Sequence, residues 1–498
     1  MEKKLKDLWN VVNVSEYQFH VTISTIDSTT ESEDTDERIV YMEDLEKRKQ
    51  AYGICGECNE PGTGETWCQP CNAKRFEDNF KNWTSGNKVI DEFIQQSQLN
   101  AVYYKKYLEW IPFEKFQDIT YIAEGGFGKV YSAEWSDGHI KYWDIENQKW
   151  HRSKHKHRRY ALKSLNNSSD ISLGFINEIK SHLQIHLLDV VQCYGITQDP
   201  NTNEYMMVLY YCDNGNLRDY LNKSEKYIDY GTKFEKLQRI ASGLLDIHIS
   251  RKVHKDFHSG NILFTNFPYI SDLGMCQPVN KQTVKEEGIY GVLPYIAPEV
   301  LRGHRYTKAA DIYSFGIIMN EFLSEEIPYN DIPHDGFLAI KICKGQRPKI
   351  SKDIPKLLAD LIMKCWDAEI ESRPTAKELY QKLTKWNKLK YYRNTEIGSQ
   401  VRECDKIGKK KFESRSSKDK SKNIQTHPQA IYTSRLFNFK NLPKPVNSSD
   451  LSSFQFNSVY TNYAIQPILA NPISECLDVQ LSELELNEIC QDGENSVE

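Results

Sequence analysis

The most constraining feature of this sequence is a short stretch near its middle, from His254 to Gly274. It begins His-Lys-Asp-Phe-His-Ser-Gly-Asn, and Asp272-Leu-Gly follows after an apolar, turn-forming link. Phosphoryl transfer needs a carboxylate to position the attacking hydroxyl and oxygen ligands to hold Mg²⁺ against the phosphates. Asp256 suits the first role, and Asn261 and Asp272 suit the second. The stretch therefore favours a phosphoryl-transfer site over a set of solvated acids.

A glycine-rich turn lies upstream of this stretch. The sequence from Ile119 to Tyr131 reads as a strand, a turn and a returning strand, and the turn itself is Ala123-Glu-Gly-Gly-Phe-Gly128. Glycine lets backbone amides approach phosphate oxygens with no side chain in the way. A glycine turn alone is weak evidence, but this one precedes the acidic stretch in the order that a nucleotide-dependent site requires.

The order of these motifs resembles the protein kinase superfamily over about residues 115–387. The stretch at His254 is similar to the catalytic loop H-R-D-x-x-x-x-N and the metal-binding D-F-G of that family. The resemblance implies an α+β, bilobal protein kinase fold with a small β-rich N-lobe and a larger helical C-lobe. It also implies ATP and Mg²⁺ as cofactors, with Asp256 catalytic and Asn261 and Asp272 as magnesium ligands.

The same resemblance extends to the nucleotide site. Tyr160-Ala-Leu-Lys163 is similar to the V-A-I-K strand, and the next helix offers Glu178 as the ion-pair partner of Lys163. Leu209 takes the gatekeeper position, followed by the hinge. The resemblance implies that ATP is bound by Ala123, Glu124, Gly125, Gly126, Phe127, Gly128, Val130, Ala161, Lys163, Leu209, Tyr210 and Cys212. Ala123 departs from the first glycine of the family's G-x-G-x-x-G.

Further matches concern the scaffold and the activation segment, which runs from Met275 to Tyr295 and closes in Ala-Pro-Glu299. Thr283 and Tyr290 are hydroxyls in it that a regulatory phosphorylation could use. In this family the residues matching Glu299 and Arg373 form a structural ion pair. The residue matching Asp311 supports the catalytic-loop backbone.

A finer resemblance concerns the group within the superfamily. Phe127-Gly, Tyr313-Ser-Phe-Gly-Ile and Cys365-Trp-Asp are similar to the tyrosine-kinase-like group. Together with the paired cysteines, Asn82-Trp-Thr-Ser-Gly-Asn, Leu108-Glu-Trp-Ile-Pro and Tyr290-Gly-Val-Leu-Pro-Tyr, the sequence resembles the lineage-expanded kinases of mycorrhizal fungi. That resemblance reaches upstream to about residue 52.

Three substitutions depart from the usual kinase pattern. Lys255 replaces an arginine and lacks its bidentate fork. His258 stands where serine/threonine kinases usually place a lysine, and Val292 stands where they usually place a threonine. We expect an ATP-dependent protein kinase with serine/threonine specificity, acting on protein substrates in intracellular signalling. The alternative is a pseudokinase scaffold that binds partners through an N-terminal cysteine knuckle and the C-terminal tail.

Two Cys-x-x-Cys pairs precede the kinase-like region, at Cys55 and Cys58 and at Cys68 and Cys71, with a Gly- and Pro-rich hairpin between them. Four thiolates on two tight turns can hold tetrahedral zinc. Two unrelated pairs of reduced cysteines, or a redox motif, are the alternatives. We predict a zinc knuckle whose main role is structural.

The remaining segments set the predicted domain organisation. We expect a flexible lead at 1–50, the knuckle at 52–75, a linker of two helices at 76–112, the kinase domain at 115–387 and a largely disordered tail at 388–498. The basic run 151–159 reads as a solvated loop or a docking site for an acidic partner. Residues 402–422 read as a solvated basic linker or as a nuclear-import or nucleic-acid-binding patch, and 477–489 as a short partner-binding helix.

Composition adds limits to the expected location and partners. The net charge of −5 over 498 residues gives no overall field toward nucleic acid or membranes. No signal peptide and no apolar run of membrane-spanning length is evident. We therefore expect a cytoplasmic protein, with nuclear access possible, no membrane association and little tendency to bind nucleic acid.

Overall fold

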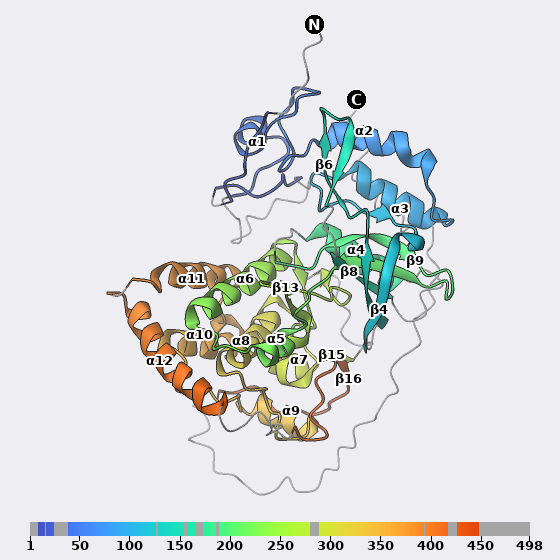
Figure 1. Cartoon of the computed structure of the whole chain (residues 1–498). Helices are drawn as coiled ribbons and strands as arrows, with labels where there is room; N and C mark the ends of the chain where they lie inside the picture. The colour runs from blue at the N-terminus through green and yellow to red at the C-terminus, as the bar shows by residue number, and fades with distance from the viewer. Residues whose placement is uncertain are drawn as a thin grey trace, which may run out of the picture.

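The computed structural model describes most of the chain (Figure 1). The described residues are 8–14, 16–23, 38–125, 128–153, 158–164, 173–185, 189–278, 288–392, 394–416 and 426–447. Several positions named from the sequence lie outside these ranges, namely Gly126, Phe127, Thr283, residues 154–157 of the basic run and the segment 477–489.

The smaller lobe is built on one twisted sheet with the strand order β3-β9-β10-β8-β5-β4. Neighbours are antiparallel except β3 and β9, which are parallel. Buried and partly exposed residues alternate along β8, where every second residue from Tyr160 onward is buried. This alternation is typical of a strand with one face toward the core. The strands are β3 (Glu109–Trp110), β4 (Phe116–Gly125), β5 (Gly128–Trp135), β8 (Arg159–Ser164), β9 (Cys193–Gln198) and β10 (Tyr205–Tyr210).

Helix α4 (Leu173–Gln184) packs on this sheet and carries Glu178 toward the lobe interface. Phe175 and Ile179 are four residues apart on the helix, so they lie on one face and are fully buried against β9 and β10. Lys106 fixes the other end of the helix, since its Nζ donates to the carbonyl oxygens of Leu183 and Ile185 at 2.8 and 2.5 Å. These contacts set the position of Glu178.

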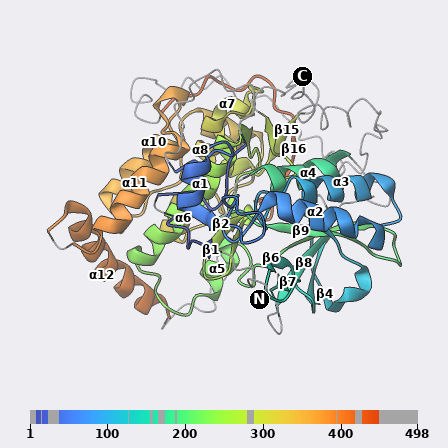
Figure 2. The same ribbon diagram turned by 90° about the horizontal axis from the view of Figure 1, so that it is seen from above.

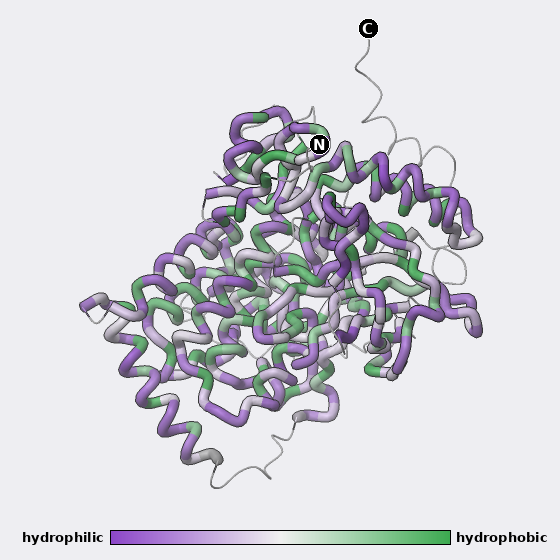
Figure 3. Tube along the Cα trace, turned by 45° about the horizontal axis from the view of Figure 1, so that its top comes forward, coloured by the Kyte–Doolittle hydropathy of each residue, from purple (hydrophilic) through white to green (hydrophobic). Residues whose placement is uncertain are grey.

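The larger lobe is helical and surrounds α8 (Lys308–Ser324), in which every residue from Ala310 onward is buried. Figure 3 shows hydrophobic stretches concentrated in the interior of this lobe. The other helices are α5 (Leu217–Lys223), α6 (Tyr230–Ile249), α7 (Pro298–Leu301), α9 (Gly336–Cys343), α10 (Lys356–Cys365) and α11 (Ala376–Leu389). Short strand pairs join β11 (Lys252–Val253) to β14 (Gln277–Pro278), and β12 (Ile262–Phe264) to β13 (Pro268–Ile270). The two lobes confirm the expected kinase architecture.

The N-terminal part contains more packed structure than the sequence predicts. Val12, Val21 and Val40 are buried with Ala51 and Tyr52 in a small core of their own. The described part of residues 1–50 is therefore not an unpacked lead, because three spaced valines find partners beside the cysteine segment. Its elements are β1 (Leu8–Trp9), paired with β2 (Gly53–Ile54), and α1 (Leu45–Tyr52). Two helices, α2 (Gln69–Asn79) and α3 (Lys88–Leu99), follow the cysteine segment, and α2 begins at Gln69, ahead of the predicted linker at 76–112.

The insertion after β5 forms a hairpin of β6 (Ile140–Asp144) and β7 (Lys149–Arg152). Figure 2 shows it beside the N-terminal helices. Trp150 on β7 stacks on Trp67 and Phe76 with ring centroids 6.0 and 5.0 Å apart. The cysteine segment is thereby packed against the smaller lobe through an aromatic cluster.

The C-terminal part also departs from the prediction. Helix α12 (Glu396–Ser416) occupies the segment expected to be a basic linker, and Ile397, Val401 and Cys404 are buried against the larger lobe. Beyond it, residues 426–447 lie on the lobe, and β16 (Arg435–Phe437) pairs with β15 (Ile289–Gly291). These described residues are ordered parts of the fold. Among the helices of the described part of the chain, none combines the length and apolarity needed to cross a bilayer.

Candidate active site

The loop that carries Asp256 is fixed by the buried carboxylate of Asp311 on α8. Asp311 accepts hydrogen bonds from the backbone amides of His254 and Lys255 at 2.8 and 3.2 Å, and it lies 3.0 Å from Nε2 of His248. Lys255 has a φ of +69°, which is unfavourable for a residue with a side chain. The Asp311 contacts hold this strained turn and thereby fix Asp256, the next residue.

A buried charge triad connects the two lobes. Lys163 Nζ lies 2.8 Å from Glu178 Oε1 and 3.0 Å from Asp272 Oδ1. Burial disfavours the ammonium form, but the carboxylates of Asp272 and Glu178 outweigh it and raise the pKa of Lys163 above its usual value. Lys163 in turn offsets burial at Asp272 and lowers the pKa of that carboxyl. The triad aligns strand β8, helix α4 and the Asp-Leu-Gly turn.

Asn261 lies beside this triad on the short turn Ser259–Asn261. Its Nδ2 donates to the backbone oxygen of Asp256 at 2.9 Å. The amide orientation is therefore set by the catalytic loop, which leaves Oδ1 as an oxygen ligand. Asn261 and Asp272 supply the amide and carboxylate oxygens that Mg²⁺ prefers.

The expected nucleotide residues meet on neighbouring strands. Val130 is the register partner of Lys163, and Ala161 is the partner of Leu209. Ala123 and Glu124 pair with Val130 and Lys129 across the turn, and Gly125 pairs with Gly128. Gly128 has a φ of +151°, which suits a residue without Cβ.

The hinge follows β10. The Tyr210 amide donates to the Gln192 carbonyl oxygen at 2.9 Å, which fixes the backbone at the start of the hinge. Cys212 is buried, and burial raises the pKa of its thiol to about 12. The thiol is therefore held neutral beside the hinge.

The departures from the kinase pattern cluster around Asp256. His258 Nδ1 accepts from the Gly260 amide at 3.1 Å, so the proton of the neutral ring lies on Nε2, which is 3.6 Å from Asp256 Oδ1. Val292, which belongs to the activation segment, is buried. Lys255 extends to Gln277, with Nζ 2.9 Å from Oε1. His258 therefore presents an N–H donor next to the Asp256 carboxylate.

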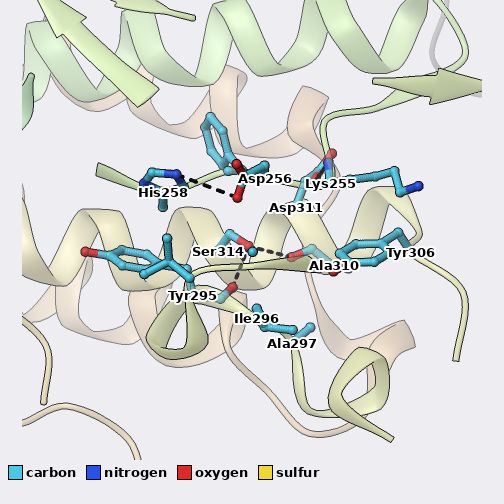
Figure 4. A pocket seen from close by; sticks show the side chains of 13 residues that line it. Lys255, Asp256, His258, Tyr295, Ile296, Ala297, Tyr306, Ala310, Asp311 and Ser314 are labelled. Atoms are coloured by element: carbon cyan, nitrogen blue, oxygen red, sulfur yellow. Dashed lines mark hydrogen bonds and ion pairs between the residues drawn. The ribbon is translucent and has the colours of Figure 1, made fainter. Parts of the chain in front are cut away.

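A small pocket opens below the catalytic loop (Figure 4). Asp256 and His258 lie on one side of it, and Tyr306 and Ser314 lie on the other. The Ser314 hydroxyl bonds to the carbonyl oxygens of Tyr295 and Ala310 at 2.7 and 3.1 Å. These bonds tie the end of the activation segment to α8.

The expected scaffold ion pair is confirmed. Arg373 donates to both carboxylate oxygens of Glu299 at 2.7 and 2.8 Å, and both side chains are buried. The guanidinium also donates to the carbonyls of Asp367 and Ala309. The pair joins α7, at the end of the activation segment, to the turn before α11.

The four N-terminal cysteines meet at one point. Their sulfur atoms all lie within 4.8 Å of one another, with Cys55 and Cys71 3.9 Å apart and Cys58 and Cys68 3.6 Å apart. Tetrahedral zinc with Zn–S bonds of about 2.3 Å needs sulfurs about 3.8 Å apart. Burial raises the pKa of the Cys71 thiol, while hydrogen bonding from Cys68 lowers the pKa of the Cys55 thiol. The donor set and its spacing fit a divalent metal.

Two residues around the Asp256 and Glu178 sites could not be predicted from the sequence. Lys106 bonds the end of α4, but an isolated lysine gives no sequence signal of such a role. Ser434 lies in a segment rich in Ser and Asn whose composition predicts disorder, yet its Oγ is 2.7 Å from Asp256 Oδ2. The phosphorylation candidate Tyr290 is engaged here as well, since its hydroxyl donates to the Ser434 carbonyl at 3.3 Å.

Comparison with known proteins is consistent with this geometry. A family model described as protein tyrosine and serine/threonine kinase matches residues 116–383. An RGS domain-containing serine/threonine-protein kinase A of Dictyostelium discoideum is 27% identical over 47% of the chain and 22% of its own length. A putative serine/threonine-protein kinase/receptor R831 of Acanthamoeba polyphaga mimivirus is 29% identical over 53% of the chain and 15% of its own length. The tyrosine-protein kinase SPK-1 of Girardia tigrina is 26% identical over 54% of the chain and 53% of its own length. The chain thus spans less than two thirds of each of these proteins.

Proposed function

We propose, because this chain belongs to the protein tyrosine and serine/threonine kinase family, that it transfers the γ-phosphoryl group of ATP to serine and threonine hydroxyls of proteins. The observation that carries the proposal is the contact of Lys163 with both Glu178 and Asp272. In kinases the corresponding Lys–Glu pair and metal-binding Asp must both be in place for transfer. An inactive scaffold has no need of this arrangement.

Each residue then has a separate task. Lys163 would hold the nucleotide phosphates, and Asn261 and Asp272 would hold Mg²⁺, whose charge would offset that of the transferred group. Asp256 accepts a hydrogen bond from the acceptor hydroxyl and orients its lone pair toward the phosphorus. The His258 Nε2 proton, beside Asp256, is available to the acceptor oxygen or to the transferred phosphoryl group, as the usual lysine would be.

Serine/threonine specificity is supported by the depth of the acceptor site. The hydroxyl of Ser434, one methylene from its backbone, reaches both Asp256 and His258. With the backbone in the same place, a tyrosine hydroxyl would extend past the position of Ser434 Oγ by the length of its aromatic ring. The tyrosine-kinase-like motifs around Tyr313 and Cys365 further favour placement in that group, and the resemblance to mycorrhizal fungal kinases is carried by the upstream motifs.

The test is phosphate transfer from radiolabelled ATP with Mg²⁺ to an acidic and a basic protein substrate. Wild type should label a substrate, and Asp256→Ala and Asp272→Ala should each abolish labelling. Equal incorporation by all three proteins would overturn the proposal, because a contaminating kinase would then explain the signal. Phosphoamino-acid analysis should yield phosphoserine or phosphothreonine, and phosphotyrosine alone would overturn the specificity.

The second candidate, a scaffold with little transfer activity, is favoured by Ala123, His258 and Val292, which depart from the usual pattern. It predicts that a preparation free of other kinases binds substrate proteins but leaves them unlabelled. We further propose that Cys55, Cys58, Cys68 and Cys71 hold one structural Zn²⁺. The metal would stabilise the segment that packs on the inserted hairpin.

A further inference from the structure

We propose that residues 426–447 are an intramolecular substrate of this kinase, with Ser434 as the phosphoryl acceptor. This inference rests on the proposed function, which supplies ATP and Mg²⁺. It goes beyond that function because it identifies one acceptor hydroxyl and the segment that presents it. The segment is part of the same chain and follows α12 after an interval that the structure does not describe.

The backbone of this segment lies where a peptide substrate must lie. Strand β16 pairs antiparallel with β15 of the activation segment, with Phe437 opposite Ile289 and Arg435 opposite Gly291 (Figure 1). Addition of a strand to an exposed edge is a general mode of peptide recognition, in which backbone hydrogen bonds give affinity and side-chain pockets give specificity. The pairing places Ser434, the residue immediately before β16, next to the catalytic loop.

The side chain of Ser434 is positioned as an acceptor. Its Oγ lies 2.8 and 2.7 Å from the two carboxylate oxygens of Asp256 and 3.1 Å from His258 Nε2. Because His258 Nδ1 already accepts from Gly260, Nε2 is the donor in this contact. The serine hydroxyl therefore donates to Asp256 and accepts from His258, and its second lone pair is free to attack.

Side chains on both sides of Ser434 anchor the segment. The ring of Tyr432 lies on the Arg218 guanidinium at 3.9 Å, and its hydroxyl donates to the Pro328 carbonyl at 2.8 Å. Phe437 is buried in the core of the larger lobe. Thr433, the neighbouring hydroxyl, is exposed. The anchors thus select Ser434 over the residue beside it.

Two further contacts hold the segment to the loop before α9. His334 donates through its amide to the Gln429 carbonyl at 3.0 Å, and its Nδ1 lies 2.8 Å from the Ile431 carbonyl. Arg435 Nη2 donates to the His334 carbonyl at 2.6 Å. The backbone is therefore fixed before and after the acceptor, which holds the Ser434 hydroxyl at the catalytic carboxylate.

The reaction balances without any further reactant. A bond forms between Ser434 Oγ and the γ-phosphorus of ATP, the bond from that phosphorus to the bridging β,γ-oxygen breaks, and ADP leaves. The hydroxyl proton passes to Asp256 and then to water. The phosphoserine carries a charge of about −1.5 to −2 against the Asp256 carboxylate, so the product repels the site and the segment detaches.

The test uses the full chain with Mg²⁺ and ATP, and phosphosites are mapped by mass spectrometry over time. Ser434 should be phosphorylated with a rate constant that stays the same over a hundredfold range of protein concentration. Thr433→Ala is the matched control and should leave that rate unchanged. Tyr432→Ala with Phe437→Ala should slow Ser434 phosphorylation at least tenfold. A rate proportional to protein concentration would overturn the intramolecular reaction.

A parallel assay separates this inference from the proposed function. The Tyr432→Ala/Phe437→Ala protein, checked for folding by its thermal transition, is given an external protein substrate. A labelled external substrate together with unmodified Ser434 in wild type would overturn the inference and leave the proposed function intact. An unlabelled external substrate and unmodified Ser434 would overturn both. Label on the external substrate and on wild-type Ser434 is the expected result.

Discussion

The ion pair between Lys163 and Glu178 offers the sharpest quantitative test of how the lobes are aligned. Their side chains are 11% and 2% exposed, and the contact distance is 2.8 Å. Glu178→Gln keeps an acceptor oxygen and the side-chain volume but removes the charge. A hydrogen bond to a charged group is worth about 1.5–3 kcal/mol, so we expect kcat/KM for ATP to fall about 10- to 150-fold, at about 1.4 kcal/mol per factor of ten.

The control is the same substitution at an exposed pair. Glu92 lies 3.5 Å from Lys88 on α3, with side chains 52% and 88% exposed. Because such a surface pair contributes about 0–1 kcal/mol at most, Glu92→Gln should leave kcat/KM unchanged within twofold. Steady-state transfer at varied ATP concentration measures both variants. If Glu178→Gln retained more than half of the wild-type value, helix α4 would not be held in place by this pair.

Three further predictions concern the buried Arg373–Glu299 ion pair, the buried His182 and the four-cysteine cluster. Arg373→Met should lower the unfolding free energy by about 3–5 kcal/mol, because it leaves the Glu299 carboxylate buried without its partner, and adding Glu299→Gln should restore part of the loss in denaturant titrations. Burial lowers the pKa of His182 to about 4, below its unfolded value of about 6.5. Acidification from pH 7 to 5 should therefore cost about 2 kcal/mol at this residue, and His182→Gln should flatten the measured pH dependence by that amount. Purified protein should contain about one zinc per chain by metal analysis; Cys58→Ser with Cys68→Ser should lose it and lower the thermal stability, whereas Cys404→Ser should retain it.

Much of the kinase site is predictable because its chemistry is local in sequence. The spacing of Asp256, Asn261 and Asp272 is fixed by one loop and one turn, so the residue types alone indicate the reaction. Lys163 and Glu178 are 15 residues apart and Asp272 is 109 residues beyond Lys163, yet motif order is enough to link them. The cysteine spacing likewise predicts a four-sulfur cluster.

The remaining features depend on contacts that leave no periodic signal. Val12, Val21 and Val40 lie among polar residues, and they form a core only because Tyr52 and Ala51 reach them. Helix α12 has a polar sequence with a narrow buried edge at Ile397, so its composition resembles that of a linker. In both cases tertiary packing outweighs local composition.

The segment 426–447 could not be predicted from the sequence for a different reason. Residues 426–447 have a sequence typical of disorder, because an added strand takes its hydrogen bonds from the edge it joins and needs few apolar residues of its own. Three polar residues and Leu436 separate Tyr432 from Phe437, and neither a helical nor a strand period joins the two aromatic residues. Only the position of β15 indicates that a strand belongs there.

The assignment of Asp256 as the catalytic carboxylate is best tested by measuring phosphate transfer and ATP binding in Asp256→Asn. The amide keeps the shape of the side chain but cannot take the hydroxyl proton. We predict an ATP dissociation constant within about twofold of wild type and a transfer rate reduced by about 10²- to 10⁴-fold, the range that a positioned general base contributes. A transfer rate within threefold of wild type, at equal ATP binding, would contradict this assignment.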